Sequence, residues 1–234
     1  MLGLRSRLAL ALVATLASSG CHAVQTSQDY YGIDTTGQSV LFVIDISGSM
    51  EGKQEGTIQD QVQAEAANRG GSEVQRRVGG TVGRILGRRV RSEANKLGAA
   101  KRELIPAIRG LDESTTFNII AFGDNIRVWK NSLIPATSGN RNTGAIYVDR
   151  LTADGGTPMR AALDRAFQFR PQTIFLLTDG QPTDASAQAI LDQVRGLNSG
   201  RTTTVHTVGL GPDQDAQFLA DLAEQNGGRF VERR

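Results

Sequence analysis

The sequence is poor in the residues that build several common functional sites. With one cysteine among 234 residues, an intramolecular disulfide and any cysteine-based zinc or iron–sulfur site are excluded. Two histidines argue against a histidine-rich metal site, and a formal net charge of only +2 excludes a strongly basic, histone-like protein. The length fits one domain with a full hydrophobic core, and 27 glycines predict many tight turns.

The N-terminal apolar run is too short to cross a bilayer. Residues 8–17 are nearly all apolar, whereas a membrane-spanning helix needs about 20 such residues. Arg5 and Arg7 precede the run and small residues follow it, an order typical of a secretory signal peptide over residues 1–20. Its removal leaves 24 of the 26 basic residues against 24 acidic ones, so the exported chain would carry no net charge.

Cys21 directly follows the small residues, and the segment resembles a bacterial lipoprotein signal, in which such a cysteine is lipidated and becomes the new N-terminus. Ser18 departs from that pattern, which usually has leucine three residues before the cysteine. The alternative is ordinary cleavage near Ala23. The first interpretation predicts a lipoprotein anchored in the membrane of the cell envelope, and the second a soluble periplasmic or secreted protein. Residues 21–38 are polar and are expected to form a tether.

Apolar runs and helical periodicities alternate along the rest of the chain. Strands are expected at residues 40–44, 117–122, 126–129, 173–178, 203–208 and 230–231, and helices at 158–167, 185–197 and 215–225. This alternation predicts an α/β fold, with a doubly wound, mostly parallel sheet flanked by helices. A three-residue turn separates the second and third strands, so this pair is expected to form an antiparallel hairpin.

In such a fold, ligands bind at the carboxyl ends of the strands, near the point where the strand order reverses. Five oxygen-bearing side chains are expected there: Asp45, Ser47 and Ser49 after the first strand, Thr157 just before a helix, and Asp179 after the fourth strand. Three hydroxyls and two carboxylates suit a hard divalent cation such as Mg²⁺. Taken singly, each of the five also fits a turn or a helix cap.

The motifs DISGS, GGTP and LLTDG, in this order, resemble the von Willebrand factor type A domain with a complete metal-ion-dependent adhesion site (MIDAS). The resemblance covers the chain after the tether, apart from one insertion, and implies a Rossmann-like fold that binds a protein ligand and has no catalytic residues. It implies that Ser47, Ser49 and Thr157 contact Mg²⁺ or Mn²⁺. Asp45 and Asp179 would act through water or exchange roles between states. The metal would then accept an acidic side chain of a protein partner.

A haloacid-dehalogenase-like phosphatase is the rival interpretation. It also has an aspartate after a hydrophobic strand and a later acidic pair, here Asp179 and Asp184. In that chemistry Asp45 would be the nucleophile, and an aspartate two residues later would be the general acid. Ser47 occupies that position and cannot serve as the acid, and Thr157 would have no role. The sequence therefore favours a binding module over a hydrolase.

An insertion at about residues 52–98 separates the first motif from the helix that follows it in related domains. Seven arginines and one glutamate lie between Arg69 and Arg91, and Gly79, Gly83 and Gly87 form a stripe at helical spacing. This basic helical segment has three interpretations: a glycine-weakened surface helix, a contact with another protein, or a contact with an anionic membrane. If the protein is instead a structural protein of the cell envelope, it would act through this basic segment. Nucleic-acid binding does not suit an exported protein.

Overall fold

The computed structural model describes residues 29–30, 32–36, 38–51, 69, 72, 95–180 and 182–233. The expected signal peptide, Cys21 and almost all of the inserted basic segment lie outside these residues. Within the described ranges, none of the helices has the length and the apolar character that crossing a bilayer requires.

Strands and helices alternate along the described chain, as the sequence pattern predicts. The strands are β1 (Asp29–Tyr30), β2 (Ile33–Asp34), β3 (Ser39–Asp45), β4 (Thr116–Phe122), β5 (Ile126–Val128), β6 (Ile134–Pro135), β7 (Thr173–Thr178), β8 (Thr204–Leu210) and β9 (Phe230–Arg233). The helices are the 3-10 helix η1 (Gly48–Glu51) and the α-helices α3 (Lys96–Gly110), α4 (Ser138–Asp149), α5 (Met159–Gln168), α6 (Ala187–Leu197) and α7 (Ala216–Gln225).

The main sheet has seven strands in the order β5-β4-β3-β7-β8-β9, and β6 also pairs with β4. Strands β4, β3, β7, β8 and β9 pair in parallel, whereas β5 and β6 run antiparallel to β4. The predicted doubly wound, mostly parallel sheet with an antiparallel edge hairpin is therefore confirmed. The first strand of the main sheet, β3, lies between β4 and β7, and the strand order reverses there.

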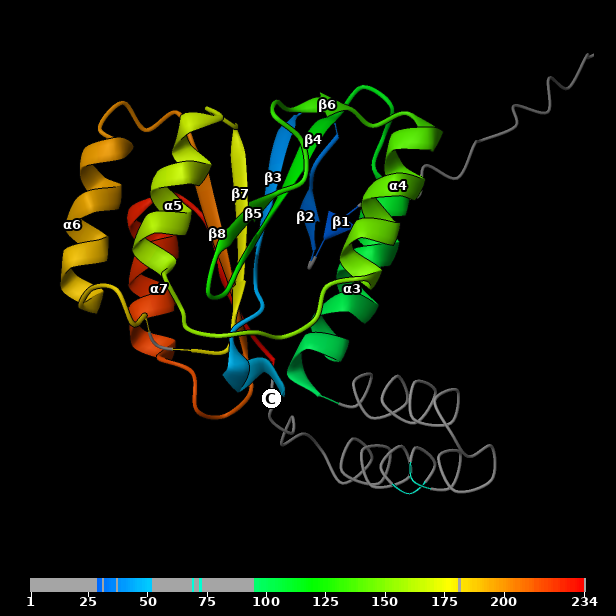
Figure 1. The fold of residues 1–234 in the computed structure, drawn as a ribbon. Helices are drawn as coiled ribbons and strands as arrows, with labels where there is room; N and C mark the ends of the chain where they lie inside the picture. Colours follow the sequence, from blue (N-terminus) through cyan, green and yellow to red (C-terminus); the bar gives the residue numbers. More distant parts are fainter. Residues whose placement is uncertain are drawn as a thin grey trace, which may run out of the picture.

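Helices cover both faces of the sheet, with α3 and α4 on one side and α5, α6 and α7 on the other (Figure 1). Strand β3 is buried on both faces because successive side chains point to opposite sides. Phe42 and Ile44 belong to the core beneath α3 and α4, and Leu41 and Val43 to the core beneath the other three helices. A continuous apolar run is what this position in the sheet requires.

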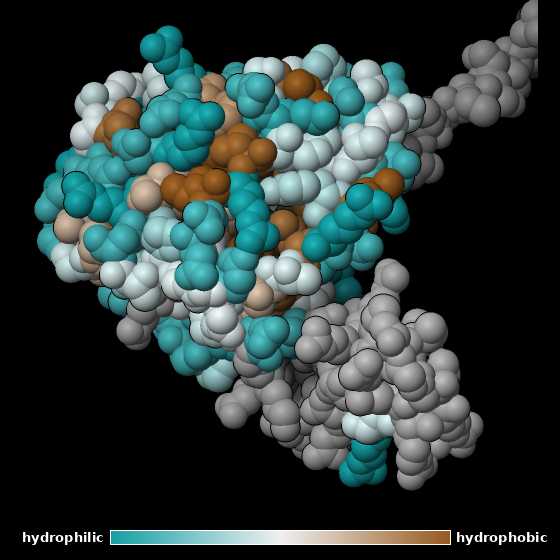
Figure 2. Space-filling model, viewed as in Figure 1, coloured by the Kyte–Doolittle hydropathy of each residue, from teal (hydrophilic) through white to brown (hydrophobic). Residues whose placement is uncertain are grey.

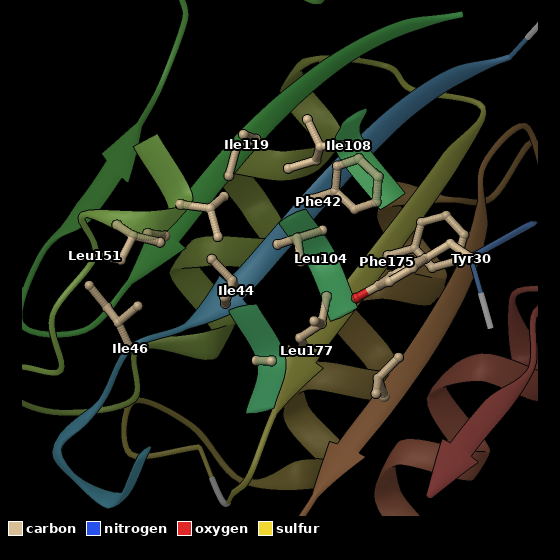
Figure 3. Close-up of a cluster of buried hydrophobic side chains, with 14 of the residues drawn as sticks. Tyr30, Phe42, Ile44, Ile46, Leu104, Ile108, Ile119, Leu151, Phe175 and Leu177 are labelled. Carbon is tan, nitrogen blue, oxygen red and sulfur yellow. The ribbon is translucent and has the colours of Figure 1, made fainter. Parts of the chain in front are cut away.

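Tyr30 extends the first of these cores beyond the expected domain boundary (Figure 3). Its ring meets Phe42 and Phe175 edge to face, with centroid distances of 5.6 and 5.0 Å, and the residue is 4% exposed. Strands β1 and β2 form a small antiparallel sheet around it. The expectation of a plain polar tether over residues 21–38 is therefore wrong from Asp29 onward, because one aromatic residue anchors this segment.

Helix α4 and strand β6 are absent from the sequence-based expectations. The N-terminal half of α4 is polar, and its buried positions include the small residues Gly144 and Ala145, so it lacks a strong apolar stripe. Helix α3 begins at Lys96 and has Asn95 as its N-cap. The expected insertion boundary at residue 98 is therefore wrong by a few residues, since Lys96 already belongs to the packed domain. The other three helices begin and end within two residues of the expected positions.

We expect Tyr30→Ala to lower the free energy of unfolding by about 3 kcal/mol, because truncating a buried aromatic ring leaves a cavity. Urea denaturation measures this change. Leu197→Ala is the control, because Leu197 is apolar but 42% exposed, and it should cost less than about 1 kcal/mol. A loss below about 1 kcal/mol for Tyr30→Ala would mean that this segment does not belong to the core.

Candidate metal site

The register of β3 and β7 places Asp45 beside the end of β7. Ile44 pairs with Leu177, so Thr178 is the neighbour of Asp45. The Thr178 hydroxyl donates to Asp45 Oδ2 at 2.6 Å, and the Ser47 backbone N–H donates to Oδ1 at 2.8 Å. Burial raises the pKa of the Asp45 carboxyl to about 6, although both hydrogen bonds lower it. A fully buried carboxylate is thus held in one orientation beneath the first motif.

Hydrogen bonds connect three more of the expected side chains. The hydroxyls of Ser47 and Ser49 are 3.0 Å apart, and the Ser49 hydroxyl donates to Asp179 Oδ1 at 2.9 Å. Ser47 and Asp179 are buried, whereas Ser49 is exposed at the start of η1. The exposed Ser49 hydroxyl therefore connects two buried side chains and is the point at which a ligand can reach this group.

Thr157 lies in a loop that packs against the first motif. The Gly48 backbone N–H donates to the Gly155 carbonyl at 2.9 Å. The Thr157 backbone N–H donates to the Thr183 hydroxyl, and the Thr157 carbonyl accepts from the Thr183 backbone N–H, each at 3.0 Å. Pro158, expected at the first helical position, is the N-cap of α5, and its own side chain makes no capping hydrogen bond. In the described part of the chain the Thr157 hydroxyl has no hydrogen-bond partner, so it remains available to a ligand.

Asp124 and Gly155 fix the path of this second loop. Asp124 Oδ1 accepts a hydrogen bond from the Gly156 backbone N–H at 3.1 Å. Gly155 has a φ of +64°, and a Cβ atom there would lie 1.6 Å from Asp124 Oδ1. Glycine is therefore required at this position both for its backbone conformation and for the close approach of the Asp124 carboxylate.

Asp184, the second acidic residue of the rival phosphatase interpretation, has a structural role. Its two carboxylate oxygens accept hydrogen bonds from the backbone N–H groups of Arg160 and Ala161, at 3.1 and 3.0 Å. These groups belong to the first turn of α5, so Asp184 caps the helix from the loop that follows β7. Sequence analysis could not assign this role, because cap and helix are more than twenty residues apart.

Lys96 contacts the candidate site, and the sequence patterns do not reveal this contact. Its ammonium donates to Asp179 Oδ2 at 2.9 Å and to Asp213 Oδ1 at 2.5 Å. Burial acts to lower the pKa of Lys96, but the hydrogen bonds to the two carboxylates outweigh it, and the pKa lies above its ordinary value. A charged lysine therefore lies directly beside the candidate site. No sequence motif connects Lys96 with the candidate site, because it is far along the chain from both Ser49 and Asp179.

The donor set fits a hard divalent cation. Asp45, Ser47, Ser49 and Asp179 form one hydrogen-bonded group, and the loop of Thr157 adjoins it. All of the side-chain atoms that these residues could offer to a metal are oxygens, the ligand atoms that Mg²⁺ and Mn²⁺ prefer. Among the described residues no three His, Cys, Asp or Glu side chains gather as a metal-binding group, so a cation here would depend on the hydroxyls.

The surrounding surface is largely hydrophilic, and in Figure 2 hydrophobic side chains emerge only in small patches. Among the described residues, the exposed large hydrophobics are Ile146 and Leu197, at 38% and 42%. They belong to α4 and α6, on opposite faces of the sheet, and therefore do not form a joint patch. A partner that meets the face in Figure 2 would depend mainly on polar contacts.

These features define a doubly wound α/β domain with an oxygen-lined loop site at its switch point. A family model described as von Willebrand factor type A domain matches residues 90–231, more than half of the chain. The chain therefore belongs to this family. The match begins after the first motif, so Asp45, Ser47 and Ser49 lie outside it.

Relatives and solved structures agree with this assignment. The chain is 27% identical over 228 residues to the mouse inter alpha-trypsin inhibitor heavy chain 4, covering 88% of this chain and 20% of that protein. It spans a tenth to a fifth of the length of the curated relatives that it matches. A von Willebrand factor type A structure from Catenulispora acidiphila superposes with a TM-score of 0.60 at 23% identity, over 86% of this chain and 39% of that one. Proximal thread matrix protein 1 from the mussel byssus, solved with its MIDAS motif occupied by zinc, superposes with a TM-score of 0.50 at 15% identity, over 85% and 42%.

We expect Gly155→Ala to destabilise the domain by about 1–3 kcal/mol and to loosen the contact between the two loops, because alanine is strained at this φ and its methyl group meets Asp124. Thermal unfolding measures the loss. Gly139→Ala is the matched control, because a Cβ atom at Gly139 meets nothing within 4 Å and the residue lies in α4. Equal stability of the two variants would contradict the proposed role of Gly155.

Proposed function

We propose that this domain binds a protein partner through a divalent cation, Mg²⁺ or Mn²⁺, held by Asp45, Ser47, Ser49, Thr157 and Asp179. One observation carries the proposal: the hydrogen-bonded series from Ser47 through Ser49 to Asp179, in which the exposed Ser49 hydroxyl connects two buried residues. Domains of this family mediate protein–protein interactions, and this chain has the oxygen donors at the expected edge of the sheet.

The residues would divide the work between holding the cation and orienting its ligands. Ser47, Ser49 and Thr157 supply neutral hydroxyl oxygens, and the two aspartates supply charge. With few anionic ligands, a bound Mg²⁺ would stay electrophilic and would attract a carboxylate of the partner. The mussel protein described above holds zinc in its MIDAS motif, which supports the view that this fold can hold a divalent cation at such a motif.

Two contacts favour a binding module over a phosphatase. Both carboxylate oxygens of Asp45 already accept hydrogen bonds, and the residue is fully buried, which suits a positioning role better than nucleophilic attack. Asp184 is engaged in capping α5. We therefore propose that the domain is not an enzyme.

Asp45→Asn tests the metal proposal. The amide keeps an acceptor for the Ser47 N–H and removes a buried charge, whereas the Thr178 hydroxyl loses its acceptor; these effects oppose each other, so the domain should stay folded. Affinity for Mg²⁺, measured by calorimetry, should fall about 10–100-fold, as for other residues that orient metal ligands. Asp221→Asn, an equal change of charge at a half-buried residue of α7, should leave the affinity unchanged. Unaltered Mg²⁺ affinity in Asp45→Asn would refute the site assignment.

We further propose that the protein is exported and anchored in the cell envelope through a lipid on Cys21. The order of basic, apolar and small residues before Cys21 supports this, and the first strand that the structure describes, β1, begins eight residues later, at Asp29. A short link would hold the domain close to the membrane surface, where the basic inserted segment could contact anionic lipids. A contact with another protein is the alternative role of that segment.

Cys21→Ser should release the protein from the membrane fraction, because the lipid would have no attachment point. Cell fractionation followed by immunoblotting measures this, and mass spectrometry of the N-terminus identifies the mature start. Ser19→Ala is the control, because it keeps a small residue before the cysteine. A wild-type protein that is soluble and begins after Ala23 would contradict the anchor and would favour ordinary cleavage.

A further inference from the structure

Lys96 carries a positive charge to the edge of a site that we assign to a positive ion. Its side chain is 4% exposed, and its ammonium contacts Asp179, one of the two proposed anionic groups. Burying a charge is costly unless it is paired, so an ammonium persists here only because of its two carboxylate partners. The Asp179 partner is fully buried, whereas the Asp213 side chain is 62% exposed.

The two oxygens of Asp179 serve different groups. Oδ1 accepts from Ser49, which belongs to the proposed metal site, and Oδ2 accepts from Lys96. A divalent cation near Ser49 would therefore share one carboxylate with the ammonium. Two positive ions on one carboxylate repel each other, and the repulsion is strong where little water screens it. The occupancy of the site must then depend on how firmly Lys96 holds Asp179.

The loop between β8 and α7 is shaped around this lysine. Gly211 has a φ of +85°, and a Cβ atom there would lie 2.7 Å from Lys96 Cε and 3.2 Å from its Nζ. The absence of a side chain at Gly211 lets the lysine stem reach Asp213, two residues further along. Asp213 thus offers the ammonium a second, exposed carboxylate on an element that contributes nothing else to the site.

We propose that Lys96 sets the affinity of this site for divalent cations by competing for Asp179, and that Asp213 retains the ammonium when Asp179 turns toward the cation. This inference rests on the proposed function, because it presumes that the five residues bind Mg²⁺. It assigns a role to two residues outside the MIDAS motifs. It also predicts effects of opposite sign for the two partners, which a purely structural ion pair would not produce.

The first variant is Lys96→Met, which keeps the length and the apolar character of the stem. Without the ammonium, Asp179 keeps only its Ser49 hydrogen bond, so the protein without added metal should unfold at a lower temperature. Mg²⁺ should bind about tenfold more tightly than to the wild type, and it should raise the unfolding temperature by a larger increment. If Lys96 is only structural, both the stability and the Mg²⁺ affinity should fall.

The second variant is Asp213→Asn. It leaves Asp179 as the only carboxylate partner of the ammonium, so Mg²⁺ should bind more weakly, by about threefold or more. Because Asp213 is largely exposed, this variant is expected to fold. If Lys96→Met does not fold, the Mg²⁺ affinity of Asp213→Asn tests the competition model alone. Lys130→Met is the net-charge control for Lys96→Met, because it also removes one positive charge and Lys130 is exposed over the Trp129 ring. It should bind Mg²⁺ like the wild type.

The outcomes separate this inference from the proposed function. If the wild type binds Mg²⁺ and Lys96→Met binds no more tightly, the competition model is overturned while the metal site stands. Unchanged or tighter binding by Asp213→Asn overturns the role of Asp213. If neither the wild type nor Lys96→Met binds Mg²⁺, both proposals fail. Binding gained only in Lys96→Met would show that the lysine keeps the cation out.

Discussion

The parallel pairing of β3 with β7 is the constraint on which the candidate site depends. It sets Asp45 beside Thr178 and brings Asp179 to the same edge, although more than 130 residues of chain separate them. Both strands lie in the middle of the sheet, covered on each face, so a slip in register would misplace buried side chains throughout both cores. The hydrophobic packing of the strands therefore fixes the polar geometry at their ends.

The same edge concentrates charge where little water can solvate it. Asp45 is fully buried, and its raised pKa reflects the cost of keeping a carboxylate there. The Lys96 ammonium compensates the charge of Asp179. Among the described residues, Asp45 has hydroxyl and backbone N–H donors but no cationic partner. Such an arrangement is poorly compensated by protein groups alone, and a cation shared by the two loops would improve it. The electrostatics thus favour a ligand at this edge more than the hydrogen bonds alone would.

Much of the fold could be predicted because its determinants are local. A continuous apolar run marks a strand covered on both faces, and amphipathic spacing marks α5, α6 and α7. Helix α4 escaped prediction because its packing uses small residues such as Gly144 and Ala145. Tyr30 escaped because two adjacent tyrosines in a mostly polar stretch have no periodicity, and only the contacts of Tyr30 with β3 and β7 show that it belongs to the core.

The residues at the candidate site also divide into those with a local sequence pattern and those that depend on distant contacts. Asp45, Ser47 and Ser49 lie close together in one motif, and the motif order made Thr157 and Asp179 predictable. Their supporting residues could not be found in this way. Asp124, Asp184 and Lys96 act through contacts with distant segments, and nothing in their own neighbourhoods distinguishes them from surface charges. Sequence patterns locate the residues of the proposed site, whereas the residues that contact them from distant segments emerge only from the folded chain.

The chain leaves the described domain after Glu51 and rejoins it at Asn95, and both positions adjoin the edge that carries the candidate site. Met50, one residue before η1 ends, is fully buried, and Asn95 caps α3 by accepting from the Gly98 backbone N–H. Chain-closure entropy rises only with the logarithm of loop length, so going from about four to about forty residues costs roughly 2 kcal/mol. Two well-anchored ends can offset that cost. Because Lys96 is the first residue after the cap, the ion pair with Asp179 is one of these anchors. The ion pair beside the candidate site therefore also fixes the point at which the chain rejoins the described domain after residue 94.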